Sequence, residues 1–188
     1  MRKWYLALLA LMSIFVASPV AAGYIWWEAE SPVAETNVER IIDPPESASG
    51  KVLSKHGRIE AADPEGPKMR AEYRVDVPAG GDYHLWVRKF WRHGPFHWRF
   101  HRAEWQTCRR DFPLHADTYI EINNGTNWIY LGEVTLDAGP HAFEIESIDN
   151  AGFIDCFLLI DGPFQPAGRL KPGRKSGKAE AGWFAWEP

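Results

Sequence analysis

Short stretches of alternating apolar and polar residues, separated by turn residues, occupy much of the chain. From Ala71 to Val77 every second side chain is apolar and those between are charged, which is the two-residue period of a strand with one buried face. Turn residues at 78–81 follow, and then a second apolar-rich run over Asp82–Phe90. No long segment shows a helical period with capping residues. The pattern therefore predicts antiparallel strands.

The same pattern recurs toward the C-terminus. Asn124-Gly125 separates two such runs and suits a two-residue hairpin turn, because both residues tolerate positive φ. The last run is apolar on both faces except at Asp155, as in a central strand. The other predicted strands are Tyr24–Glu30, Thr118–Asn123, Asn127–Leu131, Glu133–Leu136, His141–Ile148 and Phe153–Asp161. Many short strands at this spacing predict an all-β fold, a sandwich or a barrel.

The core of this fold is predicted from the inward-facing strand positions. They are Tyr73, Val75, Val77, Leu85, Val87, Ile120, Ile122, Phe143, Ile145 and Leu158. Trp86, Trp98 and Phe100 also lie in strand-like patterns and are expected in the core.

The first 22 residues have the features of a secretory signal. Arg2 and Lys3 precede an apolar run over residues 4–17, and the small residues of Val20-Ala21-Ala22 suit cleavage after Ala22. A membrane anchor is the alternative, but the run is short for a span. We therefore predict a signal over 1–22, one domain over 23–162 and a Pro/Gly/Lys-rich linker or tail over 163–188. The protein is expected to be secreted, at the cell surface or periplasmic.

Charge and cysteine content bear on the kind of partner and on covalent cross-links. The 188-residue chain has a formal net charge of −4, which does not favour nucleic acid as a partner. Its two cysteines, Cys108 and Cys156, predict a disulfide in an oxidising compartment. Two buried thiols that never meet are the alternative.

Catalytic motifs are missing from the sequence. It contains no Gly-x-Ser-x-Gly, phosphate-binding loop, dinucleotide fingerprint or His-Glu-x-x-His. Glu144 and Glu146 point to one side of a strand and are interpreted as a solvated face rather than an acid/base pair. The chain is therefore not expected to be an enzyme.

Three acidic residues indicate a metal site. Glu28 and Glu30 project from the same side of a strand, where their charges repel, and Asp155 stands in an apolar run where burial requires a partner. Calcium is a suitable hard cation for all three. The alternative is that both glutamates are exposed and that Asp155 pairs with an arginine.

The segment from residue 86 to 110 is rich in aromatic and basic residues. Sugars bind through C–H faces laid on aromatic rings, with polar side chains fixing the hydroxyl groups. The predicted platform residues are Trp91 and Trp105, because they lie nearer to loops. The predicted polar contacts are Arg92, Arg99 and Arg102, which would also suit an acidic glycan. The alternative is that these arginines stack on tryptophans for structural reasons.

Four segments, in this order, resemble the carbohydrate-binding modules of families six and thirty-five, in the galactose-binding-domain-like group. They are residues 27–30 (WEAE), 49–53 (SGKVL), 73–88 (YRVDVPAGGDYHLWVR) and 152–155 (GFID). The resemblance covers about residues 24 to 161 and implies a two-sheet antiparallel jelly-roll β-sandwich. It also implies a structural calcium on Glu28, Glu30 and Asp155, sugar binding at loop tips and no catalysis. Residues 91–116 are longer and more basic than the equivalent loop, so the family's ligand aromatics do not map onto them.

The expected function is thus a non-catalytic carbohydrate-binding module of an exported protein, with a polysaccharide or oligosaccharide as partner. Such modules are usually joined to polysaccharide-degrading catalytic domains, and residues 166–173 look like the joint to one. The main alternative is a cell-surface adhesion or assembly domain without a sugar ligand. An unrecognised small hydrolase or lyase is a third possibility.

Overall fold

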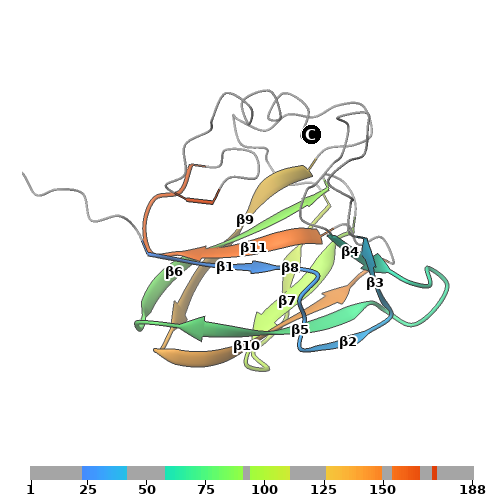
Figure 1. Ribbon diagram of the computed structural model, residues 1–188, viewed down its shortest axis with the longest axis horizontal. Coiled ribbons are helices and arrows are strands. Elements are labelled where there is room, and N and C mark those ends of the chain that lie inside the picture. The colour runs from blue at the N-terminus through green and yellow to red at the C-terminus, as the bar shows by residue number, and fades with distance from the viewer. Residues whose placement is uncertain are drawn as a thin grey trace, which may run out of the picture.

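The computed structural model describes residues 23–41, 58–90, 94–110, 126–149, 154–165 and 171–172. In these residues all regular structure is β (Figure 1). The strands are β1 (Tyr24–Glu28), β2 (Ala34–Thr36), β3 (Val38–Ile41), β4 (Arg58–Ala61), β5 (Arg70–Val77), β6 (Gly81–Phe90), β7 (Phe96–Phe100), β8 (Gln106–Cys108), β9 (Thr126–Leu136), β10 (Gly139–Ser147) and β11 (Ile154–Ile160).

The strands form two antiparallel sheets. The first sheet has the order β3-β4-β11-β6-β9, and β1 also pairs with β11. The second has the order β2-β5-β10-β7-β8. In Figure 1, β6, β9 and β11 lie above β5 and β10 as two layers. The predicted all-β sandwich of two packed antiparallel sheets is confirmed.

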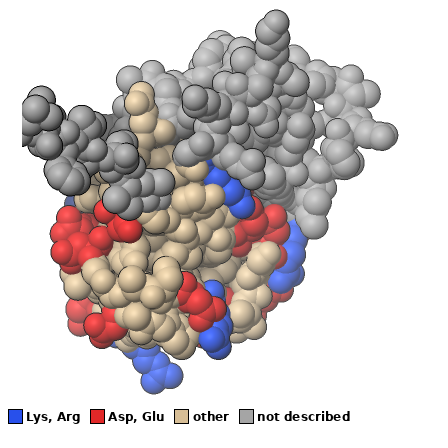
Figure 2. Space-filling view, turned by 60° about the vertical axis from the view of Figure 1, so that its left-hand side comes forward, with Lys and Arg blue, Asp and Glu red and all other residues tan. Residues whose placement is uncertain are grey.

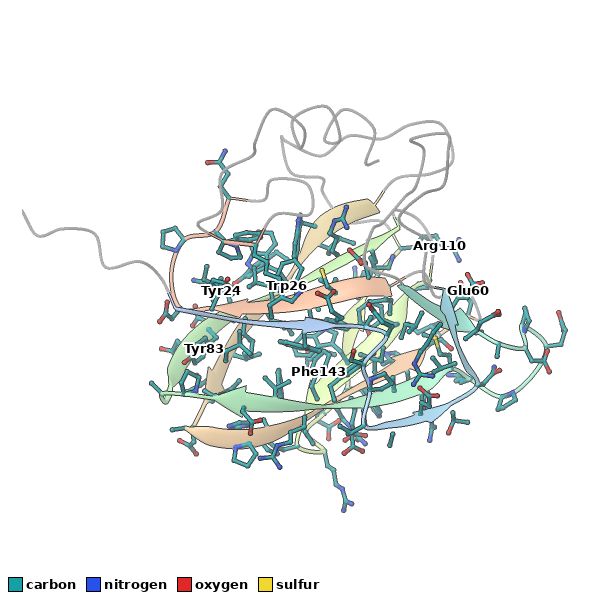
Figure 3. All side chains as sticks on the ribbon, viewed as in Figure 1. Tyr24, Trp26, Glu60, Tyr83, Arg110 and Phe143 are labelled. Carbon is teal, nitrogen blue, oxygen red and sulfur yellow. The ribbon has the colours of Figure 1, made fainter. Side chains whose placement is uncertain are left out.

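The main hydrophobic core lies between the two sheets, where Figure 3 shows Phe143 between the layers. In β5 and β10 apolar side chains are buried at every second position, as their alternation predicts. The predicted core residues that the structure describes are all at most 7% exposed. Ile120 and Ile122 lie outside the described residues. Leu158 is buried, but not between the sheets.

Leu158 belongs to a second cluster on the outer face of the first sheet. Trp86, Trp128, Cys156, Leu158 and Ile160 form it, and Trp26 and Phe164 pack against it. Figure 3 shows Trp26 on the side of β1 away from Phe143. The outer face of an antiparallel sandwich is normally solvated. This sheet instead buries apolar side chains on both faces, which explains why β11 is apolar except at Asp155.

The predicted disulfide is wrong. Cys108 and Cys156 are both buried and both free. Cys108 belongs to the core between the sheets, whereas Cys156 belongs to the cluster on the outer face of the first sheet. Their side chains therefore lie on opposite sides of that sheet and cannot meet at the bonding distance that a disulfide requires.

Two predicted strands are one in the structure. Asn127–Leu131 and Glu133–Leu136 both belong to β9, which continues through Gly132 at a φ of 130°. The pairing with β6 shifts register at this point, between Leu85 and Trp86. Only glycine adopts this φ without strain, so the residue that interrupts the sequence pattern is a bulge within one strand.

Several predictions fall outside the described residues. They are the signal over 1–22, the hairpin at Asn124-Gly125 and most of the tail over 163–188. Within the described ranges, no helix has the length and apolar character needed to cross a membrane.

Candidate functional site

Trp105 and Arg99 meet on the outer face of the second sheet. In β7 the side chains of Phe96, Trp98 and Phe100 point into the core, so Arg99 points outward. Trp105 immediately precedes β8 and is 36% exposed. The Arg99 guanidinium carbon lies 4.0 Å from the centre of the Trp105 ring, and Arg99 Nη2 donates a 2.7 Å hydrogen bond to Glu144 Oε2. The stacked guanidinium holds this exposed ring in a fixed position.

A hollow of about 190 Å³ lies beside the ring. Its polar lining comes from neighbouring strands of the second sheet: Glu35, Thr36, Arg70, Glu72, Arg99 and Glu144. An aromatic ring next to carboxylates, guanidiniums and a hydroxyl is the combination that binds the apolar face and the hydroxyl groups of a sugar. The sequence pattern indicates Trp105 and Arg99 but not the other lining residues, because only strand pairing brings them together.

Arg102, the third described residue of the predicted site, lies in the turn after β7. His101 and Arg102 have φ values of 48° and 58°, and the Ala103 amide donates a 2.9 Å hydrogen bond to the Phe100 carbonyl. Positive φ at both central residues is typical of a turn that favours Asn-Gly. Arg102 is exposed and does not line the hollow. Trp91 and Arg92 lie outside the described residues.

The predicted preference for an acidic glycan is not supported. Arg99 is paired with Glu144, and Arg110 is paired with Asp149. The hollow itself carries three carboxylates and two guanidiniums. On the face drawn in Figure 2, acidic side chains are interspersed with isolated basic ones among the described residues. Three arginines of the described part of the basic segment, Arg88, Arg99 and Arg110, are therefore already paired with carboxylates.

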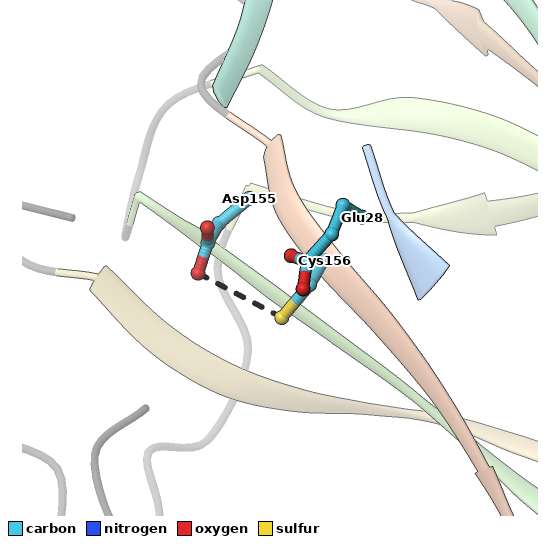
Figure 4. A group of neighbouring side chains, drawn as sticks. All are labelled: Glu28, Asp155 and Cys156. Atoms are coloured by element: carbon cyan, nitrogen blue, oxygen red, sulfur yellow. Dashed lines mark hydrogen bonds between the residues drawn. The ribbon is translucent and has the colours of Figure 1, made fainter. Parts of the chain in front are cut away.

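Two of the three predicted metal ligands, Glu28 and Asp155, come together where the end of β1 meets the start of β11, and the charge of Glu30 lies near both. Glu28 is paired with Cys156 across the two strands, and Ala29 N donates a 2.8 Å hydrogen bond to the Asp155 carbonyl. Oxygens of Glu28 and Asp155 and the sulfur of Cys156 all lie within 4.8 Å of one another (Figure 4). The pairing of β1 with β11 thus joins residues more than 120 positions apart in the sequence.

The charges of this cluster are only partly balanced. The pKa of Glu30 is raised to about 7, first by burial and also by the nearby charges of Glu28 and Asp155, against the lowering effects of a backbone hydrogen bond and of Arg40. Asp155 forms a buried ion pair with Arg88. With three ionised carboxylates and one guanidinium, the cluster carries a formal charge of −2. A single divalent cation would neutralise this charge.

The donor atoms fit a hard cation in part. Oε2 of Glu28 and Oε2 of Glu30 are buried and have no hydrogen-bond partner among the described residues. Trp26 Nε1 donates a 2.7 Å hydrogen bond to the other oxygen of Glu28, which leaves Oε2 available. Asp155 is already shared with Arg88 and accepts a weak 3.7 Å hydrogen bond from Cys156 Sγ. A calcium ion would therefore rest mainly on Glu28 and Glu30. The alternative that Asp155 pairs with an arginine is thus borne out, and the sequence did not indicate that this arginine is Arg88.

No protein-family profile and no curated protein matches the sequence. Among solved structures, a GH26-CBM35 β-(1,4)-mannanase from Podospora anserina is similar at a TM-score of 0.53 and 15% identity. The match covers 78% of this chain and 29% of the mannanase chain. At this identity it shows that the two share a fold, and the chain spans less than a third of the length of that enzyme.

Two separate carbohydrate-binding modules also match. A family 35 module from Clostridium thermocellum has a TM-score of 0.47 and 13% identity, with coverage of 76% of this chain and 100% of the module. The C-terminal CBM6 of the laminarinase LamC from Zobellia galactanivorans has a TM-score of 0.46 and 16% identity, with coverage of 73% and 98%. The predicted resemblance to modules of families six and thirty-five thus reappears among the structural matches.

Proposed function

We propose that this protein is a non-catalytic carbohydrate-binding domain and that it binds glycan on the outer face of the second sheet. The observation that carries the proposal is the exposed Trp105 ring, fixed by Arg99 beside a hollow lined with hydrogen-bonding side chains. Trp105 would stack on the C–H face of a sugar ring. Glu72, Glu144 and Thr36 would accept or donate hydrogen bonds with its hydroxyl groups.

The proposed ligand is a neutral glycan. The hollow contains carboxylates as well as guanidiniums, and an acidic sugar would be placed beside Glu35, Glu72 and Glu144. Binding of a neutral sugar should change little between low and high salt, because screening acts on charged pairs. We further propose that the domain acts outside the cell, where polysaccharides occur, and that it belongs to a polysaccharide-degrading architecture.

A structural calcium ion on Glu28, Glu30 and Asp155 is part of the proposal. The two buried Oε2 atoms of the glutamates and the formal charge of −2 support it. When bound, the ion would supply positive charge that holds the end of β1 against the start of β11. It would therefore stabilise the sandwich where these two strands pair.

Replacing Trp105 by alanine should weaken glycan binding at this face at least about tenfold, which corresponds to about 1.4 kcal/mol. The reason is that stacking removes apolar area of the ring and the sugar from water. The measurement is isothermal titration with cellohexaose, mannohexaose and xylohexaose, after a glycan array has identified which backbone binds.

Ile148→Ala is the matched control, because Ile148 has a similar exposure of 38% and does not line the hollow. It should leave the affinity unchanged. If Trp105→Ala keeps the wild-type number of sites, each at wild-type affinity, the site has been placed wrongly. If no glycan on the array binds the wild-type protein, the carbohydrate-binding function itself fails, and adhesion without a sugar becomes the better account.

A further inference from the structure

An aromatic group covers part of the outer face of the first sheet and does not contribute to the Trp105 site. The Trp86 ring centre lies 5.0 Å from that of Tyr130 and 5.3 Å from that of Phe164. Trp128 lies 5.2 Å from Phe164 on the other side. These rings come from β6, from β9 and from the segment after β11. The pairing of β6 with β9 brings the first rings together, and the chain that leaves β11 adds Phe164.

The group is open to solvent at Tyr130. This side chain is 38% exposed, although its neighbour Trp86 is only 7% exposed. A hollow of about 310 Å³ lies between Tyr130, Trp86 and His84 on one side and Pro163 and Phe164 on the other. Small-molecule sites usually measure ~300–1,000 Å³, so this hollow has the size for a small unit such as one sugar ring.

One edge of the hollow is polar. His84 Nδ1 and the Tyr130 hydroxyl are hydrogen-bonded at 3.0 Å. Glu133 lies opposite His84 in the pairing of β6 with β9 and is exposed. Burial raises the pKa of Tyr130, and the charge of Glu133 raises it further, which is consistent with their proximity. An apolar wall of rings thus faces an imidazole and a phenol, and the Glu133 carboxylate lies near Tyr130 beyond the residues that line the hollow.

We propose that this hollow is a second glycan-binding site, which takes one pyranose ring of a neutral polysaccharide. The ring would stack on the exposed part of Tyr130 and against Phe164, and its hydroxyl groups would bond with His84 and Glu133. This inference rests on the proposed carbohydrate-binding function, but not on the position of the Trp105 site. A purely apolar ligand fits less well, since it would leave the polar edge without partners.

The two sites lie on opposite faces of the sandwich. Trp105 is on the outer face of the second sheet, and Tyr130 is on the outer face of the first. A straight stretch of one polysaccharide cannot contact both faces of a rigid two-layer domain. Occupation of both sites therefore joins two polysaccharide chains, and the domain acts as a cross-linker with increased avidity for dense polysaccharide.

The test uses Tyr130→Ala, Trp105→Ala and the double variant, titrated with cellohexaose, mannohexaose and xylohexaose. Wild type should bind two hexasaccharides per chain, each single variant one, and the double variant none. Glu133→Gln keeps all the rings and should weaken the second site several-fold, so a folding defect in Tyr130→Ala does not remove the test. Wild type should also raise the viscosity of the matching polysaccharide, whereas either single variant should not.

The outcomes separate the two proposals. If Trp105→Ala abolishes all binding and Tyr130→Ala and Glu133→Gln change nothing, the second site is overturned while the proposed function stands. If Tyr130→Ala abolishes all binding and Trp105→Ala changes nothing, the hollow at Tyr130 is the glycan site and the Trp105 assignment fails. If wild type binds no hexasaccharide and no glycan on the array, both proposals fail.

Discussion

Replacing Arg88 by methionine is expected to lower the free energy of unfolding by about 3–5 kcal/mol. Arg88 is 1% exposed and forms an ion pair with Asp155, which is 3% exposed. Removing the guanidinium leaves Asp155 buried beside Glu28 and Glu30, whose charges repel it. The measurement is urea denaturation at pH 8 in the presence of EDTA, with folding checked by circular dichroism.

Arg74→Met is the matched control. Arg74 also pairs with an aspartate, Asp76, but both side chains are more than 60% exposed. This substitution should change stability by no more than about 0.5–1 kcal/mol. Combining Arg88→Met with Asp155→Asn should cost less than the sum of the two single effects, because the double variant has no unpaired buried charge. Equal losses of unfolding free energy for Arg88→Met and Arg74→Met would show that the buried Arg88–Asp155 pair contributes no more than an exposed pair.

Calcium should raise the melting temperature of the wild-type protein, by about 5–10 °C when its concentration is a hundredfold above its dissociation constant. An ion that binds only the folded state contributes about 2.7 kcal/mol at that concentration, and a domain of this size gains about 2–4 °C per kcal/mol. The substitution Glu30→Gln should abolish this rise. It removes one of the two carboxylates whose buried Oε2 atoms are available to the ion.

The same substitution should have the opposite effect without calcium. In EDTA at pH 8, above the raised pKa of Glu30, the carboxylate repels Glu28 and Asp155. A neutral glutamine should then stabilise the protein rather than destabilise it. Glu39→Gln is the control, since Glu39 is exposed on β3, and it should leave both melting temperatures unchanged. A wild-type melting temperature that is the same in calcium and in EDTA would rule out the structural ion.

The sequence by itself determined the fold class and the main core. In β5 and β10 the period of two assigns each side chain to one face, so alternation alone identifies Val75 and Ile145 as buried. β6 and β11 were recognised from long apolar runs between turn residues. In contrast, β2, β3, β4 and β8 have only three or four residues each, which is too few for a period to be visible.

The chemistry of the sites depended more on tertiary structure. Residue types indicated Glu28, Glu30, Asp155, Trp105 and Arg99 as functional residues, because acids in apolar runs and aromatic residues near arginines are unusual. The pairing of β1 and β6 with β11 decided that Asp155 meets both the glutamates and Arg88. The pairing of β7 with β10 decided that Arg99 is held by Glu144.

The strand pattern does not show that the sandwich buries apolar side chains in two separate clusters. The outer face of the first sheet carries tryptophans from three strands and is covered in part by Phe164, so Cys156 lies on the far side of that sheet from Cys108. This arrangement separates the cysteines and creates the hollow at Tyr130. Local alternation shows which residues share a face of a strand. Which elements cover that face depends on how segments distant in the sequence pack against it, and only the tertiary structure decided that packing.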